Sequence, residues 1–85
     1  MLLSDIRVRN AKPKLSPYKI ADGQGMYLLV QPGGGKYWRL NYRFAGKQKT
    51  LALGTYPEVG LGAARKKRLE ARELLAMHPP VDPML

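Results

Sequence analysis

The chain has 85 residues, no cysteine and a formal net charge of +9, with an isoelectric point near 10.2. This length suits one small domain, and so positive a field favours a polyanionic partner: DNA, RNA or an anionic membrane surface. A membrane is the least favoured of the three, because no apolar run is long enough to span a bilayer and the start lacks the apolar region of a signal peptide. The absence of cysteine excludes a disulfide framework and a thiolate metal site, and it fits a reducing cytoplasm.

The first part of the sequence predicts a short helix followed by an edge strand. Ser4 and Asp5 are typical of a helix N-cap with an acid in the first turn, and the helix is expected to reach about Asn10. Two prolines follow, and proline disfavours a helical conformation in the residue before it. Residues 18–21 have the composition of a short edge strand, and the glycines within 22–25 predict a turn.

Three main strands are expected over residues 26–31, 36–44 and 48–53, with a glycine-rich connection after the first and a hairpin loop at 45–47. The middle strand alternates strictly between apolar and polar residues, so successive side chains point to opposite faces. Its core-facing side carries Trp38, Leu40, Tyr42 and Phe44. Its outward side carries Arg39, Asn41 and Arg43, joined from the third strand by Gln48, Thr50 and Ala52.

A second helix is expected from about Leu61 to Met77, where His78 and two prolines end it. Its basic run, Arg65–Arg68, is typical of a solvated helix face. The fold class is therefore α+β: a three-stranded antiparallel sheet, with a short edge strand beside it, packed against a C-terminal helix and preceded by a short N-terminal helix.

The middle of the sequence predicts a surface that binds nucleic acid. Residues 23–57 contain five basic residues and no acidic one. Arginine and asparagine hydrogen-bond guanine and adenine edges in a major groove, which assigns base contacts to Arg39, Asn41 and Arg43. Lysine is a point charge on a flexible stem and is better suited to phosphates. That role is assigned to Lys36, Lys47 and Lys49, although Lys49 has the strand parity of the core-facing Leu51.

Other site residues are less specific. Gln48 and Thr50 are candidate DNA contacts because they share the outward face with Arg39 and Arg43. Tyr27 is expected on the outward face, either against a sugar or thymine methyl or as an ordinary exposed tyrosine. The basic residues near the start, from Arg7 to Lys14, form either an arm along the DNA backbone or unstructured surface charge. No glycine-rich phosphate loop occurs, and no tyrosine has neighbouring residues that mark a nucleophile. No catalytic residue, metal ligand or cofactor is therefore expected.

An ordered set of short motifs resembles a known family. The set comprises Leu3-Ser-Asp, Asn10-Ala-Lys-Pro, Asp22-Gly-Gln-Gly-Met-Tyr-Leu, Lys36-Tyr-Trp-Arg, Tyr42-Arg, Gly46-Lys, Leu53-Gly-Thr-Tyr-Pro and Ala64-Arg. In this order they resemble the N-terminal domain of tyrosine-recombinase integrases carried by prophages and genomic islands. The chain departs from that family at Gly60-Leu-Gly62, where the family usually has Ser-Leu-Ala.

The resemblance implies a sequence-specific double-stranded DNA-binding module that grips arm-type sites and supports DNA integration and recombination. Arg39, Arg43 and Lys47 fall on the family's motif positions. It also implies that residues 1–85 are a single N-terminal domain, with 78–85 beginning the linker to the core-binding and catalytic domains. Other integrase subunits are further expected partners, and the expected location is the bacterial cytoplasm at the nucleoid.

Two other function classes remain open from the sequence. A small sheet backed by a helix also serves RNA-binding modules, but these stack bases on exposed aromatics, whereas Trp38, Tyr42 and Phe44 are expected inside. A protein-interaction domain for recombinase assembly would use the C-terminal helix or the tail, and this role is compatible with DNA binding.

Overall fold

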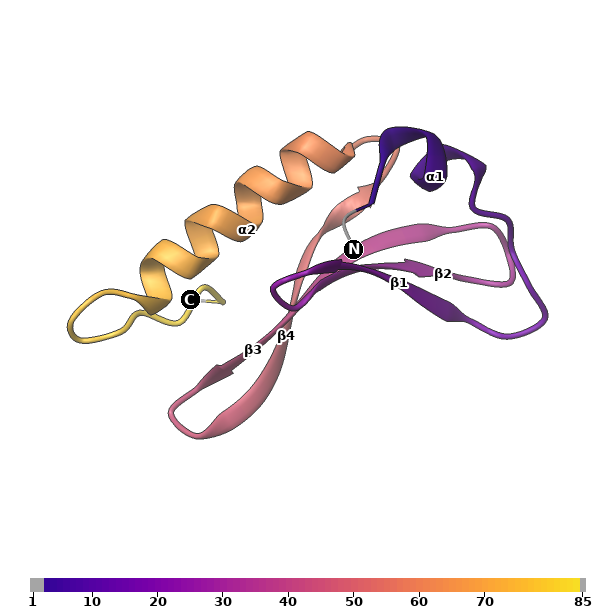
Figure 1. Ribbon diagram of the computed structural model, residues 1–85. Coiled ribbons are helices and arrows are strands. Elements are labelled where there is room, and N and C mark those ends of the chain that lie inside the picture. The colour runs from indigo at the N-terminus through magenta and orange to yellow at the C-terminus, as the bar shows by residue number, and fades with distance from the viewer. Residues whose placement is uncertain (1–2, 85) are drawn as a thin grey trace.

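A computed structural model of the protein describes residues 3–84, and it has a four-stranded sheet with both helices on one side (Figure 1). The elements are α1 (Asp5–Asn10), β1 (Tyr18–Gly23), β2 (Met26–Val30), β3 (Lys36–Phe44), β4 (Lys47–Tyr56) and α2 (Leu61–Leu75). All strand pairs are antiparallel and the strand order is β1-β2-β3-β4. The α+β prediction is confirmed. The expected short edge strand is β1, and together with the three main strands it makes a four-stranded sheet. No helix within residues 3–84 is long and apolar enough to cross a membrane.

The core lies between the sheet and the two helices, as the alternation in β3 predicts. Trp38 and Leu40 are fully buried, and Tyr42 is 8% exposed. The Trp38 indole N–H donates to the carbonyl of Val59 at 2.7 Å, so the one polar group of this large side chain is paired. α2 contributes Leu61, Ala64 and Ala71 to the same cluster.

The sheet bends where β3 and β4 pass through a register shift. Trp38 pairs with Gly54 but Arg39 pairs with Ala52, so one residue of β4 is extra. That residue, Leu53, is buried. Gly54 has φ of +128°, and a Cβ there would lie 2.5 Å from the Val59 side chain, so the bulge requires glycine at this position.

Both helices begin where the sequence predicts. The Ser4 hydroxyl accepts from the Arg7 N–H at 3.2 Å and caps α1, which ends at Asn10. α2 begins at Leu61 and ends two residues before the predicted Met77, although its N-cap residue offers no side-chain hydrogen bond. Good apolar contacts on the inner face compensate for this weak start.

Part of the basic run on α2 is not solvated, contrary to the sequence-based prediction. Arg65 donates to both carboxylate oxygens of Asp22, at 3.0 and 2.8 Å, and Arg68 donates to one of them at 2.9 Å. Asp22 is fully buried and also accepts from the Leu3 N–H at 2.7 Å. Burial alone would raise the pKa of Asp22, but the hydrogen bonds from Arg65, Leu3 and Arg68 hold it below its ordinary value. This carboxylate therefore ties the N-terminal segment, the end of β1 and α2 together.

Candidate nucleic-acid interface

The sheet face opposite the helices gathers six of the residues that the sequence predicts to contact DNA. Antiparallel pairing places directly opposed residues on the same face, and the register defines three rows of side chains. These rows are Tyr27–Arg39–Ala52, Asn41–Thr50 and Arg43–Gln48. The predicted outward set on β3 and β4 is therefore one continuous surface, which we call the outer face.

Arg39 lies near the centre of the outer face and is half-buried. Its guanidinium lies 5.4 Å from the ring centre of Tyr37, which shares its face of β3. A cation beside an aromatic ring is held without losing its charge or its outward hydrogen-bond donors. Tyr37 was not among the predicted site residues, although it lies two positions from Arg39 on β3 and therefore shares its face.

Asn41 and Thr50 form an oriented pair one row further along the hairpin. The Thr50 hydroxyl donates to the side-chain amide oxygen (Oδ1) of Asn41 at 2.8 Å. This bond leaves the two N–H donors of the amide and the second lone pair of its oxygen available. An asparagine oriented in this way keeps the donor and acceptor that an adenine edge requires.

Arg43 and Lys47 lie at the tip of the β3–β4 hairpin, which extends beyond β1 and β2 (Figure 1). Arg43 donates to the carbonyl of Gly46 at 3.2 Å, so its side chain is directed toward the hairpin loop. Lys47 and Gln48 are exposed. The tip therefore projects two cations away from the body of the domain.

Tyr27 continues the outer face toward the free edge of the sheet. The ammonium of Lys19 on β1 lies 4.8 Å from the Tyr27 ring centre. Lys19 pairs with Leu29, whose strand parity is that of Tyr27, so Lys19 also belongs to this face. Sequence reasoning did not include it, because the edge strand was too short to define its faces.

Lys36 and Lys49 do not join the outer face. Lys36 has the strand parity of Trp38, and its ammonium donates to the carbonyls of Val8 and Arg9 at 2.8 and 3.0 Å. These carbonyls end α1, where a cation is favoured by the helix dipole. Lys49 points to the helix side, as its parity suggests, and pairs with Asp82. The geometry therefore does not support phosphate contacts for either lysine.

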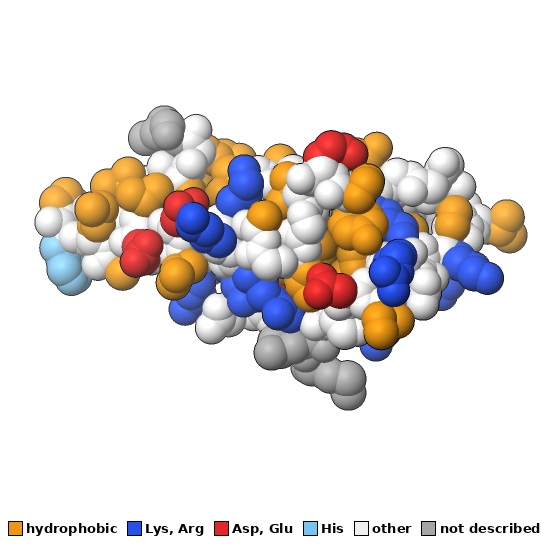
Figure 2. Space-filling view, turned by 90° about the horizontal axis from the view of Figure 1, so that it is seen from above, with side chains coloured by type: hydrophobic (Ala, Val, Ile, Leu, Met, Phe, Trp, Pro, Cys, Tyr) orange, Lys and Arg blue, Asp and Glu red, His pale blue; other side chains and the backbone are white. Residues whose placement is uncertain are grey.

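The acidic residues are kept away from the outer face. Asp22 and Asp82 are buried in ion pairs. The remaining four are exposed on α1, on the loop after β4 and on α2, namely Asp5, Glu58, Glu70 and Glu73. Figure 2 shows acidic side chains among basic and hydrophobic ones on the helix-bearing side. Within residues 3–84, the outer face thus combines cations and amides without a competing carboxylate.

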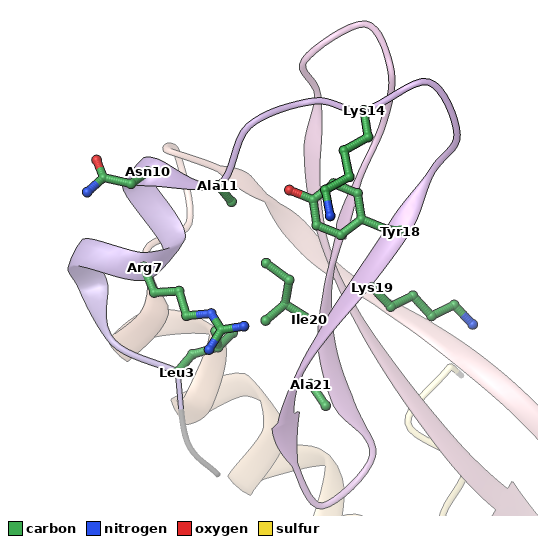
Figure 3. Close-up of a pocket in the computed structure, with 9 residues that line it drawn as sticks. All are labelled: Leu3, Arg7, Asn10, Ala11, Lys14, Tyr18, Lys19, Ile20 and Ala21. Carbon is green, nitrogen blue, oxygen red and sulfur yellow. The ribbon is translucent and has the colours of Figure 1, made fainter.

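A shallow hollow of about 700 Å³ lies between α1, the following loop and β1 (Figure 3). Arg7 points into it, and Lys14 lies 4.4 Å from the ring centre of Tyr18. The Tyr18 hydroxyl donates to the Lys12 carbonyl at 2.6 Å and holds the loop against the sheet. The N-terminal basic residues considered as an arm are therefore attached to the domain along its β1 edge.

Comparison with known proteins identifies the family of the chain. The family described as "Arm DNA-binding domain" matches residues 3–84. The integrase of Enterobacteria phage P4 is 47% identical over 85 residues, which cover 98% of this chain and 19% of that protein. Prophage integrase IntS of Escherichia coli K12 is 40% identical over 83 residues, covering 98% of this chain and 21% of that protein.

A shorter match is more similar. Putative protein IntB of Escherichia coli K12 is 67% identical over 51 residues, which cover 60% of this chain and 13% of that protein. The chain thus spans about a fifth or less of the length of these relatives. The match over residues 3–84 nevertheless includes every helix and strand described above. The chain belongs to the Arm DNA-binding domain family, and it is a DNA-binding domain of the type found in phage and prophage integrases.

Proposed function

We propose that this domain binds arm-type sites in double-stranded DNA, with sequence specificity, as part of a tyrosine-recombinase integrase. The outer face lies in the major groove, and binding supports DNA integration and recombination. The observation that carries the proposal is the composition of the outer face. Arg39, Asn41 and Arg43 follow one another along one strand, and no acidic residue lies in the rows beside them.

The dimensions suit this mode. Neighbouring strands are about 4.8 Å apart, and the major groove is about 12 Å wide, so the two-stranded hairpin enters while further strands approach the groove walls. Arg39 and Arg43 are assigned to guanine edges, and Asn41, oriented by Thr50, to an adenine edge. Lys47 is assigned to a phosphate at the groove wall, and Gln48 to a base edge or phosphate beside Arg43.

Fluorescence anisotropy on two duplexes of equal length tests the proposal. One duplex is taken from the attachment region of the parent element, and the other is its scrambled counterpart. The native duplex is expected to bind more tightly, and Arg39→Ala should weaken it by about 1–3 kcal/mol. Arg72→Ala, an exposed arginine on α2, is the matched control and should leave affinity nearly unchanged. Equal binding to both duplexes would refute sequence-specific reading.

RNA binding is the second candidate, because Tyr27 and Tyr37 lie on the outer face. Single-stranded RNA is usually bound by stacking bases on such rings. Here Lys19 lies over the Tyr27 ring and Arg39 lies near the Tyr37 ring, so cations already occupy the positions that bases would take. This arrangement favours the duplex. Tighter binding to a single-stranded RNA than to the native duplex would reverse the order of the two candidates.

A further inference from the structure

The segment after α2 folds back onto the sheet. The Val81 N–H donates to the carbonyl of Leu74 at 2.9 Å, which turns the segment back after the helix ends. Figure 1 shows this segment returning from the end of α2 toward the β3–β4 hairpin. Asp82, only 3% exposed, is the residue through which this segment contacts the strands. Among residues 78–84 Asp82 is therefore the buried anchor, while most of its neighbours in this segment are exposed.

The Asp82 carboxylate binds one residue from each strand of the hairpin. One oxygen accepts from the Tyr42 hydroxyl at 2.6 Å and from the Met84 N–H at 3.0 Å. The other oxygen accepts from the ammonium of Lys49. Charged hydrogen bonds to a buried carboxylate are stronger than neutral ones, so this contact fixes the geometry of the groups that it joins.

Tyr42 and Lys49 are direct cross-strand partners, and the rows on either side of them face outward. The Asn41–Thr50 row lies on one side of this pair and the Arg43–Gln48 row on the other. Side chains alternate along a strand, so the Tyr42–Lys49 pair points to the helix side while the pairs before and after it point outward. Asp82 therefore binds, on the helix side, the one pair that lies between two rows of the outer face. We call this contact the Asp82 clasp.

On the helix side, the described residues leave a gap beside the tip of the hairpin. An apolar hollow of about 410 Å³ lies between the hairpin tip and the end of α2. Its lining residues are Arg43, Phe44, Ala45, Leu75, Pro79 and Pro80. The tip therefore lacks close packing from α2, and the polar clasp is the contact best placed to limit its twisting.

We propose that Asp82 is a positioning residue for DNA recognition, which holds the Asn41–Thr50 and Arg43–Gln48 rows in the orientation that reads bases. The proposal rests on the function proposed above. It assigns specificity to a residue that does not touch DNA.

The clasp predicts a selective loss rather than a general one. Removing it frees the hairpin to sample other twists, which weakens bonds that need fixed geometry more than attraction to phosphates. Affinity for the native duplex is then expected to fall by about five- to tenfold. Affinity for the scrambled duplex, which depends on charge, should change little. The ratio of the two affinities is therefore the quantity to measure.

Asp82→Asn tests the proposal, with Glu70→Gln, an exposed acid on α2, as control for the loss of one negative charge. Tyr42→Phe is the second variant, because it removes one bond of the clasp and keeps the buried ring. Circular dichroism establishes that each variant is folded, and anisotropy gives the native-to-scrambled ratio. Hydrogen exchange on the free domain should show faster exchange in residues 41–50 than in wild type, with β1 and β2 unchanged.

The outcomes separate this role from the function on which it rests. A lowered affinity ratio with local loss of protection in Asp82→Asn, and a smaller change of the same kind in Tyr42→Phe, supports the clasp. If wild type prefers the native duplex and the folded variants keep the same native-to-scrambled affinity ratio, the positioning role of Asp82 is refuted, whereas the proposed function stands. Equal binding of both duplexes by wild type refutes the reading function and the positioning role with it.

Discussion

Gly25 and Asn41 are in direct backbone contact where the β1–β2 turn meets β3: the Asn41 N–H donates to the Gly25 carbonyl at 2.9 Å. Gly25 has φ of +85°, and a Cβ at this position would collide with the carbonyl oxygen of Asn41. The backbone of a residue assigned to base contact is therefore set by a glycine 16 positions earlier in the sequence.

Substitution Gly25→Ala should accordingly destabilise the domain and displace Asn41. A non-glycine residue held in this conformation costs about 1–3 kcal/mol, and the collision adds to that. Urea unfolding measures the loss. Gly33→Ala is the matched control, because a Cβ there meets nothing within 4 Å. Equal stability of the two variants would contradict the close approach of Gly25 to β3.

Binding should weaken steeply with salt, because cations on the outer face replace counterions at phosphates. Each phosphate contact contributes about 0.9 to the slope of log affinity against log salt. Lys47→Ala should reduce this slope by about 1 and weaken native and scrambled duplexes alike. Lys66→Ala, on the exposed side of α2, is the control and should preserve the slope. A loss confined to the native duplex would argue against a phosphate role for Lys47.

Stability should depend strongly on Asp22. Asp22→Asn removes the charge that pairs with Arg65 and Arg68 and is expected to lower the free energy of unfolding by about 3 kcal/mol. The lower end of the usual range applies because the side chains of Arg65 and Arg68 are 34% and 14% exposed. Chemical unfolding beside Glu73→Gln, an exposed acid on α2, provides the comparison. Similar stability of both variants would mean that the contacts of Asp22 with Arg65, Arg68 and the Leu3 N–H contribute little to stability.

Acid should remove the contribution of Asp82 at low pH. The hydrogen bonds from Lys49 and Tyr42, which are the titratable groups facing Asp82 from β4 and β3, lower its pKa from 3.8 to about 2. A folded-state pKa below the unfolded value stabilises the fold above pH 4, and this contribution is lost as the pH falls toward 2. The stability difference between wild type and Asp82→Asn should narrow over this window. A difference that stays constant would contradict the lowered pKa.

The Asp82 clasp also makes stability depend on pH in the alkaline range, where the contribution of Tyr42 is lost as the pH rises. Burial, followed by the bond to Asp82, raises the pKa of Tyr42 from 10.0 to about 12. A raised folded-state pKa gives stability that is present below pH 10 and lost as the pH rises toward 12. In this respect the acid and alkaline limits of the hairpin depend on the same pair of side chains.

The local pattern of the sequence was sufficient to predict the faces of the sheet. The strict alternation in residues 36–44 predicts that Trp38 and Tyr42 point inward and that Arg39 and Asn41 point outward, and the structure confirms it. The α+β class is confirmed for the same reason, because strand and helix periods are local properties. Edge strand β1 was harder to define, since a short segment has too few residues to show its period.

The fate of individual charges was decided by tertiary structure. Asp22 meets Arg65 across 43 residues and Asp82 meets Lys49 across 33, while Lys36 reaches the carbonyl of Val8 across 28. The sequence by itself determined how many cations the domain has and which face of β3 Arg39 and Arg43 take. Only the fold decided which cations are neutralised on the helix side and which remain on the outer face, because an ion pair or a helix-end contact depends on groups that folding brings together from distant positions.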